Sequence, residues 1–180
     1  MASNKTWRSV VGLCVLAGAA ASAGWSKTGN AEATFKATGP AGFKIVGKTS
    51  AVDVADDGTS LTVTVKLKEI DTDNSLRNGH MQEDLEAEKF PLITLKVPLA
   101  SLKVPDDGKS VEAESKGVFG LHGQTKEIPF KYKASCKGGA CDVEGSADIN
   151  LKDYGVKVRS YLGITVKPEV SVATKFQVKK

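Results

Sequence analysis

Histidine, cysteine and aromatic residues are scarce in this sequence, and each shortage argues against a class of function. Only two histidines and three cysteines occur among 180 residues, and aromatic residues make up 6% of the chain. So few rings are too few for the two aromatic girdles of a transmembrane β-barrel. The two histidines, His80 and His122, lack a spacing typical of metal ligands. The composition therefore argues against an outer-membrane barrel and against a metal site.

Catalytic and phosphate-binding signatures are also missing. The chain has no Gly-x-Ser-x-Gly elbow, no His-Glu-x-x-His and no glycine-rich phosphate loop. A hydrolase with a Ser-His-Asp arrangement would have to use His80 or His122. Because His122 precedes Gly123 in a predicted turn, we expect it to be structural. The sequence therefore predicts a protein that is not an enzyme and has no cofactor, and a hydrolase is the disfavoured alternative.

The first 23 residues have the pattern of a secretory signal peptide. Lys5 and Arg8 precede an apolar run over residues 10–21, and small residues then lead to a cleavage site before Gly24. The run is too short to span a bilayer, so no integral membrane span is expected. We therefore predict a periplasmic or secreted protein.

The remaining residues 24–180 are predicted to form a single domain. Removing the signal peptide takes away two positive charges and no negative one, so the formal net charge falls from +4 to +2. The lysines are dispersed and not clustered. Nucleic acid is therefore excluded as a partner on electrostatic grounds.

Two cysteines remain after the predicted cleavage. Cys136 and Cys141 flank Lys-Gly-Gly-Ala, which has the composition of a hairpin turn. In an oxidising compartment this pattern predicts a disulfide. A redox pair and a pair of metal ligands are alternatives, but the spacing is wider than in redox motifs and no second Cys/His cluster would complete a zinc site.

Alternating apolar and polar residues predict about eight strands. In residues 61–67, leucines and valines alternate with threonines and lysines, which is typical of a half-buried strand. Similar runs occupy residues 93–99, 128–132, 143–151 and 170–178, and shorter candidates lie at 33–38 and 42–49. Glycine- and aspartate-containing turns separate most of these runs. The pattern predicts an antiparallel barrel or sandwich.

A helix is predicted in the long interval between strands at residues 70–89. Asp73 or Asn74 is a credible N-cap for a helix that starts near Ser75 and closes the barrel rim like a lid. Arg77 and His80 lie three residues apart and therefore on one side of this helix. Such a pair suits a carboxylate, phosphate or carbonyl group. A merely solvated helix face is the alternative.

Three segments resemble the YceI-like family, and they occur in the family's order. LRNGHMQEDLEAEKFPLITLKV (76–97) is similar to its Arg-Asx-x-His helical element, which leads through an aromatic-Pro pair into a central strand. GVFGLHGQTKEIPFKY (117–132) resembles its strand ending in a His-Gly turn, and INLKDYGVKV (149–158) resembles its Asp-aromatic-Gly element. The chain departs from the family in lacking an early His-Ser pair and in having Lys152 where arginine is common.

The resemblance implies an all-β, antiparallel, lipocalin-like barrel of about eight strands with a short helix inserted at the rim. Family members bind long-chain amphiphiles, such as polyisoprenoids, isoprenoid quinones or fatty-acid derivatives, in an apolar tunnel. Several members are dimers, so the resemblance also suggests a homodimer. The motif match assigns the ligand's head group to Arg77, Asn78 and His80. We expect the tail to contact Val63, Val65, Leu67, Leu95, Phe119, Phe130 and Ile149.

The sequence leaves open whether such a tunnel is empty or filled. Gly117, Gly120, Gly145 and Ala147 could keep a channel open, but they could equally mark bulges and bends. Cavity volume depends on packing and not on composition. A lipid-binding protein is therefore the leading interpretation, and a ligand-free interaction module of the cell envelope is the alternative.

Overall fold

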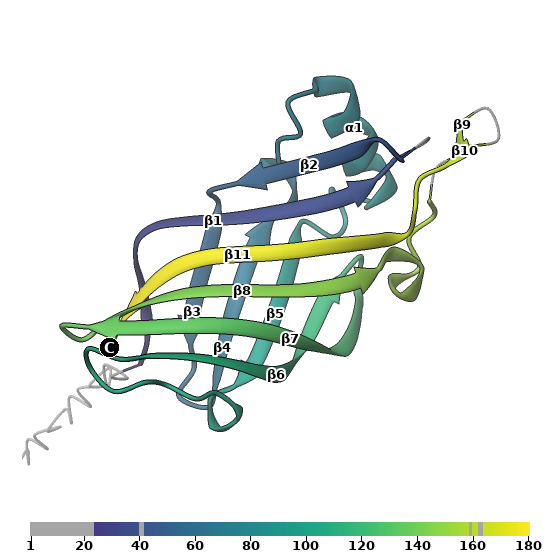
Figure 1. Ribbon diagram of the computed structural model, residues 1–180. Coiled ribbons are helices and arrows are strands. Elements are labelled where there is room, and N and C mark those ends of the chain that lie inside the picture. The colour runs from purple at the N-terminus through teal and green to yellow at the C-terminus, as the bar shows by residue number, and fades with distance from the viewer. Residues whose placement is uncertain (1–23, 40–41, 159, 162–163) are drawn as a thin grey trace, which may run out of the picture.

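Nine strands form one antiparallel sheet that curls into a nearly closed barrel (Figure 1). The computed structural model describes residues 24–39, 42–158, 160–161 and 164–180, so the predicted signal peptide lies outside the described residues. The strands of this sheet are β1 (Ser26–Thr38), β2 (Lys44–Thr49), β3 (Val52–Asp56), β4 (Ser60–Lys66), β5 (Leu92–Pro98), β6 (Ser110–Leu121), β7 (Gln124–Lys137), β8 (Ala140–Asn150) and β11 (Glu169–Lys179). A separate ribbon pairs β9 (Ser160–Tyr161) with β10 (Ile164–Thr165).

The all-β barrel that the sequence predicted is confirmed, with nine strands in the sheet. The spatial order is β2-β1-β11-β8-β7-β6-β5-β4-β3, so the two edge strands are consecutive in the chain. Near the edge, Lys27 Nζ donates to the carbonyl oxygen of Val52 at 2.9 Å, and the N–H of Trp25 donates to Asp56 Oδ2 at 2.9 Å. These bonds tie β1 to β3 and nearly close the barrel.

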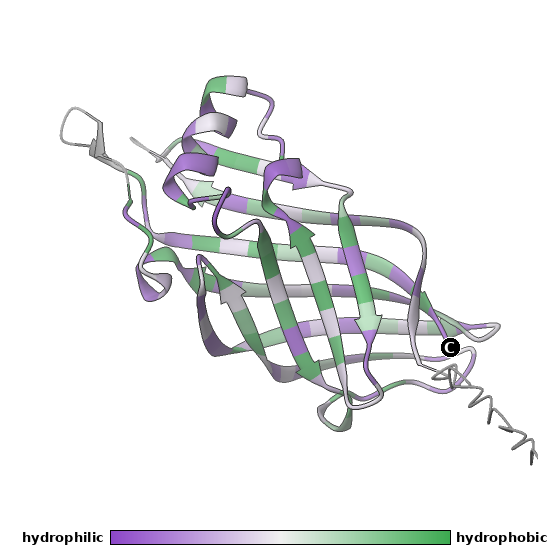
Figure 2. Ribbon diagram, turned by 180° about the vertical axis from the view of Figure 1, so that it is seen from behind, coloured by the Kyte–Doolittle hydropathy of each residue, from purple (hydrophilic) through white to green (hydrophobic). Residues whose placement is uncertain are grey.

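The core lies inside the barrel because apolar and polar residues alternate along the strands (Figure 2). β7 is the clearest case: its alternate residues Ile128, Phe130 and Tyr132 are buried, and the intervening Pro129 and Lys131 are exposed. Successive side chains of a strand point to opposite faces, so this period of two separates an apolar interior from a charged exterior.

Charged residues form an alternating row across the outside of five neighbouring strands. The strand register aligns Glu112, Lys133, Glu144, Lys175 and Glu32 across β6, β7, β8, β11 and β1. Lys175 Nζ lies 2.9 Å from Glu144 Oε1. This ion pair lowers the pKa of the Glu144 carboxyl and raises the pKa of Lys175. Exposed pairs of this kind contribute little to stability, because water and salt screen them. The row places two of the dispersed lysines, Lys133 and Lys175, between carboxylates.

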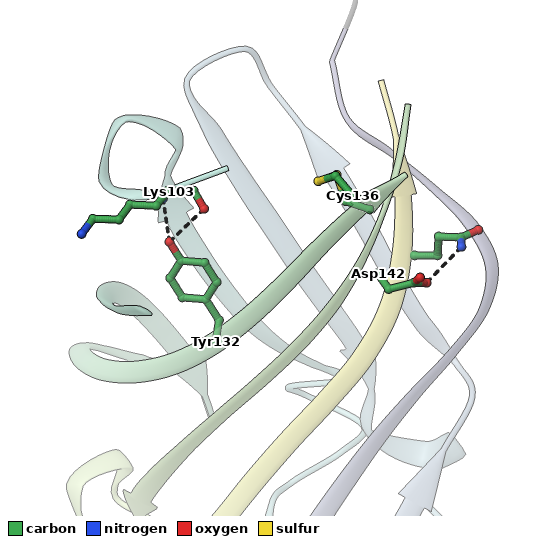
Figure 3. Close-up of a disulfide and its surroundings, with 6 residues drawn as sticks. Lys103, Tyr132, Cys136 and Asp142 are labelled. Atoms are coloured by element: carbon green, nitrogen blue, oxygen red, sulfur yellow. Dashed lines mark hydrogen bonds between the residues drawn. A yellow bond between two sulfur atoms is a disulfide. The ribbon is translucent and has the colours of Figure 1, made fainter. Parts of the chain in front are cut away.

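One end of the barrel, which we call the closed end, is held by a disulfide. Cys136 and Cys141 face each other across the β7–β8 hairpin with their Cα atoms 4.0 Å apart, which confirms the predicted pairing. Close to them, the Tyr132 hydroxyl accepts a hydrogen bond from the N–H of Lys103 at 2.6 Å (Figure 3). The carbonyl oxygen of Lys109 accepts from the N–H of Cys136 at 3.1 Å. The loop after β5 is thereby fixed to the hairpin.

Candidate functional site

Helix α1 (Ser75–Asp84) lies at the other end of the barrel, which we call the mouth (Figure 1). The side chain of Asn74, one of the two N-cap candidates from the sequence, caps it by accepting from the N–H of Arg77 at 2.9 Å. No residue of α1 is fully buried, and Met81 only partly packs against the core. Most residues of α1 are polar, and those on its inner side border a cavity.

Polar side chains anchor the start of α1 to the segment before it. Arg77 Nε donates to Thr72 Oγ1 at 3.0 Å, and Arg77 Nη2 donates to the carbonyl oxygen of Thr72. The side-chain oxygen of Asn78 accepts from the N–H and the hydroxyl of Thr72 at 2.9 and 2.6 Å. Asn78 Nδ2 also donates to Asp71 at 2.8 Å. Thr72 is thus a buried hub whose polar groups are all engaged.

The hub perturbs one carboxyl group at its edge. The side-chain amide of Asn78, followed by the N–H of Asp73, donates to Asp71 and lowers the pKa of that exposed carboxyl below its ordinary value. Asp71 also exchanges two backbone hydrogen bonds of 2.8 Å with Lys48 on β2. The segment before α1 is therefore fixed to both the helix and an edge strand.

An apolar cavity of about 510 Å³ opens beneath α1. Its wall is mainly aliphatic and aromatic and comes from β1, β2, β5, β6, β8, β11 and the segment after β8. Its polar margin includes Arg77, His80 and Asp84 of α1 and Lys157. Ligand pockets in proteins commonly have volumes of about 300–1,000 Å³ with a few polar groups at one side. The mouth cavity has the size and polarity expected for one amphiphilic molecule.

A second, smaller cavity of about 90 Å³ lies deeper in the barrel. Three residues border both cavities: Phe35 on β1, Ile93 on β5 and Phe119 on β6, which we call the collar. The deep cavity is almost wholly apolar, and Val97 and Phe130 in its wall pack with Tyr132 and Ala134 toward the closed end. The two cavities therefore follow one another along the inside of the barrel, separated by the collar.

Grooves also occur on the outside of the barrel, but their chemistry is different. Two grooves of about 650 and 540 Å³ cross the outer face of β6, β7, β8 and β11. Glu114 and Lys131 line both grooves, and these two side chains lie 3.5 Å apart. A hydrocarbon chain would gain little from such a surface, because the charged groups stay hydrated.

Most residues predicted to contact a ligand tail do border these cavities. Ile149 and Phe119 line the mouth cavity, and the deep cavity is lined by Val63, Val65, Leu95, Phe119 and Phe130. Leu67 borders neither cavity. It is fully buried in the 3₁₀ turn Leu67–Glu69 that ends β4, and its N–H donates to the carbonyl oxygen of Pro91.

The three residues assigned to the head group occupy different positions. Arg77 and His80 both line the mouth cavity, so their spacing on α1 does bring them to one side. Two of the five N–H donors of Arg77 are used by Thr72, which leaves three. Asn78 is not part of the lining, and its side chain is occupied by Thr72 and Asp71. The structure therefore places Arg77 and His80 beside the mouth cavity and Asn78 outside its lining.

The small residues of the barrel wall divide into two groups. Gly145 and Ala147 line the deep cavity, where larger side chains would fill it. Gly117 and Gly120 instead permit close strand approach, since a Cβ on Gly117 would lie 2.9 Å from Leu95 and a Cβ on Gly120 would lie 2.5 Å from Thr94. The reading as channel residues thus applies to Gly145 and Ala147, whereas Gly117 and Gly120 lie in an unbroken β6–β7 register and mark no bulge there.

His122 has the structural position that its sequence context suggested. It adopts a φ of 52° in the β6–β7 turn, its Nδ1 lies 3.0 Å from the carbonyl oxygen of Tyr154, and its ring contacts Phe90 edge-on. The next residue, Gly123, has a φ of 72°, and any Cβ there would lie 2.5 Å from Phe90. His122 therefore joins the end of the α1–β5 connection to the segment after β8, outside the cavities.

Several cavity residues were not identified from the sequence. Phe35 and Val170 lie on strands whose alternation was recognised, so the same period of two could have found them. Met81 lines the cavity from α1, directly after His80 in the chain. Val156 follows the 3₁₀ turn Leu151–Tyr154 in an irregular segment, where no periodic signal exists.

The described part of the chain offers little for metal binding or for spanning a bilayer. Within it, no three His, Cys, Asp or Glu side chains are grouped so that they could hold a metal ion. None of its helices is both long enough and apolar enough to cross a membrane.

Comparison with known proteins gives one family and several similar structures. The YceI-like domain family matches residues 20–178. A polyisoprenoid binding domain from Saccharophagus degradans, implicated in plant cell wall breakdown, has a TM-score of 0.74 and 15% identity, covering 87% of this chain and 98% of its own. Burkholderia cenocepacia BcnA has a TM-score of 0.64 and 15% identity, covering 82% and 95%. Campylobacter jejuni YceI protein has a TM-score of 0.51 and 17% identity, covering 72% and 80%.

The structural matches are informative about the fold alone, because their sequence identities are low. No curated protein matches the chain.

Proposed function

Because this chain belongs to the YceI-like domain family, we propose that it binds one long-chain amphiphile inside its barrel and acts on it by holding it, without catalysis. The tail would pass from the mouth cavity toward the collar, and the polar end would stay beside α1. The ligand classes that fit this arrangement are polyisoprenoids, isoprenoid quinones and fatty-acid derivatives. One similar structure is described as a polyisoprenoid binding domain, which supports this choice.

The observation that carries the proposal is the mouth cavity. It has about 510 Å³ of space under a helix with no fully buried residue, and its wall is mostly apolar. Each buried methylene contributes about 0.8 kcal/mol, so ten of them contribute about 8 kcal/mol before the costs of association. A net free energy of that size corresponds to a roughly micromolar complex, and the costs of association lower the net value, so a longer tail is needed for the same affinity. A hydrocarbon tail could therefore be held with few polar contacts.

Arg77 and His80 are the proposed contacts of the polar end. Arg77 is held in place by Thr72 and keeps three donors for a ligand oxygen. His80 is half-buried and has no hydrogen bond within the described residues, so its ring nitrogens are available. A carboxylate, phosphate or hydroxyl group could accept from this pair.

The proposal also includes an extracytoplasmic location. The signal-peptide pattern of residues 1–23 and the Cys136–Cys141 disulfide both support export to the periplasm or the exterior. A disulfide in such a compartment persists, whereas the cytosol would reduce it.

Native mass spectrometry of the exported protein, followed by lipid extraction, tests the proposal. We expect one long-chain amphiphile per chain, or uptake of added palmitic acid or geranylgeraniol. Ala37 lines the mouth cavity, so Ala37→Phe should fill it and abolish binding. Ala55 is exposed on β3, so the matched substitution Ala55→Phe should leave binding unchanged.

Two results would count against the proposal. A wild-type protein that is empty and takes up neither probe would favour a ligand-free interaction module of the cell envelope. Equal binding by Ala37→Phe and the wild type would place the ligand outside the mouth cavity. The head-group contact is tested by His80→Ala, which should weaken binding about tenfold; unchanged affinity would remove that contact and leave the cavity assignment intact.

A further inference from the structure

Two large apolar side chains project into solvent beside the mouth. Phe43, just before β2, is 59% exposed, and Leu76, at the start of α1, is 68% exposed. No large apolar side chain in the described residues is more exposed than these two. They come from separate segments, yet Arg77 connects them: it follows Leu76 in the chain, and its guanidinium carbon lies 5.9 Å from the centre of the Phe43 ring.

The exposed Phe43 lies in a segment whose backbone is hydrogen-bonded. The carbonyl oxygen of Phe43 accepts from the N–H of Gly39 at 2.6 Å, which closes the connection between β1 and β2. Gly42 precedes it with a φ of 79°. Leu76 is likewise fixed, since it stands in the first turn of a capped helix and borders the mouth cavity. Both side chains are therefore held at the edge of the opening.

Cations accompany these apolar groups. Lys44 follows Phe43 directly, and Lys157 and Arg77 line the mouth cavity. None of the three takes part in an ion pair within the described residues, whereas many lysines elsewhere on the barrel pair with a carboxylate. The cavity lining includes a single acid, Asp84. The edge of the opening thus combines exposed apolar groups with unpaired positive charge.

We propose that Phe43, Lys44, Leu76, Arg77 and Lys157, which we call the mouth rim, dock the protein on the surface of an anionic phospholipid bilayer. Apolar side chains enter the region between head groups and acyl chains, and lysine and arginine are attracted by anionic lipids. In this orientation the cavity opens toward the acyl region. An amphiphile could then pass between bilayer and barrel without exposing its tail to water.

Vesicle sedimentation tests this docking surface. The probes are vesicles of phosphatidylcholine alone and of phosphatidylcholine mixed with phosphatidylglycerol. We expect the wild type to bind the mixed vesicles more strongly and to release them at high salt. Phe43→Ser/Leu76→Ser should weaken binding on the order of a hundredfold, because two apolar groups no longer enter the bilayer.

The chain offers a matched control for that variant. Val104, 53% exposed in the loop after β5, and Val118, 44% exposed on the outside of β6, are also solvent-facing apolar residues. Val104→Ser/Val118→Ser should bind vesicles as the wild type does. A wild type that binds neither vesicle, a rim variant that binds like the wild type, or a control that loses binding equally would each overturn the proposal.

A second copy of the chain is the competing occupant of the rim. Light scattering after size exclusion distinguishes it: a wild-type dimer that becomes monomeric in Phe43→Ser/Leu76→Ser, with no vesicle binding by either, would assign the rim to self-association and overturn bilayer docking.

The proposed bilayer docking and the proposed ligand binding can be refuted independently of each other. Vesicle binding does not require an occupied cavity, so Ala37→Phe should still dock even though it cannot hold a ligand. Phe43→Ser/Lys44→Ser changes two rim residues that lie outside the cavity lining, so it should retain its ligand by native mass spectrometry but bind vesicles more weakly than the wild type. Wild-type vesicle binding without any bound ligand would preserve docking and refute the proposed function.

Discussion

The two ends of the barrel are built in opposite ways. At the closed end, a disulfide, a buried tyrosine with a hydrogen-bonded hydroxyl and a packed apolar cluster fix the hairpins to one another. At the mouth, a helix with no fully buried residue covers a cavity, and polar bonds around Thr72 hold it. The difference indicates a division of roles, in which the closed end supplies stability and the mouth supplies space.

The largest predicted effect concerns packing at the closed end. Phe130 is 8% exposed and packs with Tyr132 and Val97, so Phe130→Ala should lower the free energy of unfolding by about 3 kcal/mol. Leu76→Ala at the mouth should change it little, because that side chain is already exposed. Urea unfolding measures both, and similar losses would erase the distinction between the ends.

Removing the disulfide should have the next largest effect. Because Cys136 and Cys141 are five residues apart, the loop that they close is small, and Cys136→Ser/Cys141→Ser should cost about 2 kcal/mol. Ligand binding at the mouth should persist in this variant. Urea unfolding and native mass spectrometry check the two parts, and loss of the ligand without unfolding would show that the ends are coupled.

Breaking the hub at the mouth should have a smaller and local effect. Thr72→Val removes the hydroxyl that bonds Asn78 and Arg77, at a cost of about 1 kcal/mol. We expect faster amide hydrogen exchange in α1 and unchanged exchange in the β7–β8 hairpin. Tyr132→Phe is the matched loss of a hydroxyl at the closed end. Faster exchange throughout the barrel for Thr72→Val would show that the mouth is not an independent unit.

The smallest predicted effect is a pH dependence at the same hub. The pKa of Asp71 is lowered in the folded protein, so its ionised carboxyl stabilises the fold. This stabilisation is fully present above the ordinary pKa of about 3.9 and is lost as the pH falls through the lower, folded value. The amide resonances of Asp73 and Asn78 should therefore titrate below pH 4. Asp71→Asn should abolish this titration, and its persistence in that variant would assign it to another group.

The barrel could be predicted because its strands alternate so regularly. Burial along β7 and β4 follows the period of two that the sequence shows, and the N-cap of α1 was readable from Asn74. β3 was not anticipated as a separate strand, because it is only five residues long and the turn residues on either side dominate the local pattern.

The candidate site was only partly predictable for two physical reasons. Alternation shows which residues face inward, but not whether their side chains leave space, so the cavities and the collar could not be foreseen. Residues near the mouth also form local hydrogen bonds that spacing does not reveal. Asn78 shares the helical motif with Arg77 and His80, yet its side chain is consumed by Thr72 and Asp71.

The collar of Phe35, Ile93 and Phe119 gives the proposed binding a dependence on tail length. A tail that ends above the collar gains about 0.8 kcal/mol with each added methylene. A longer tail must displace Phe119 or Phe35 before it can reach the deep cavity, so affinity should rise with carbon number and then level off. The barrel would then discriminate among homologous ligands at a point set by three side chains, none of which touches the polar end.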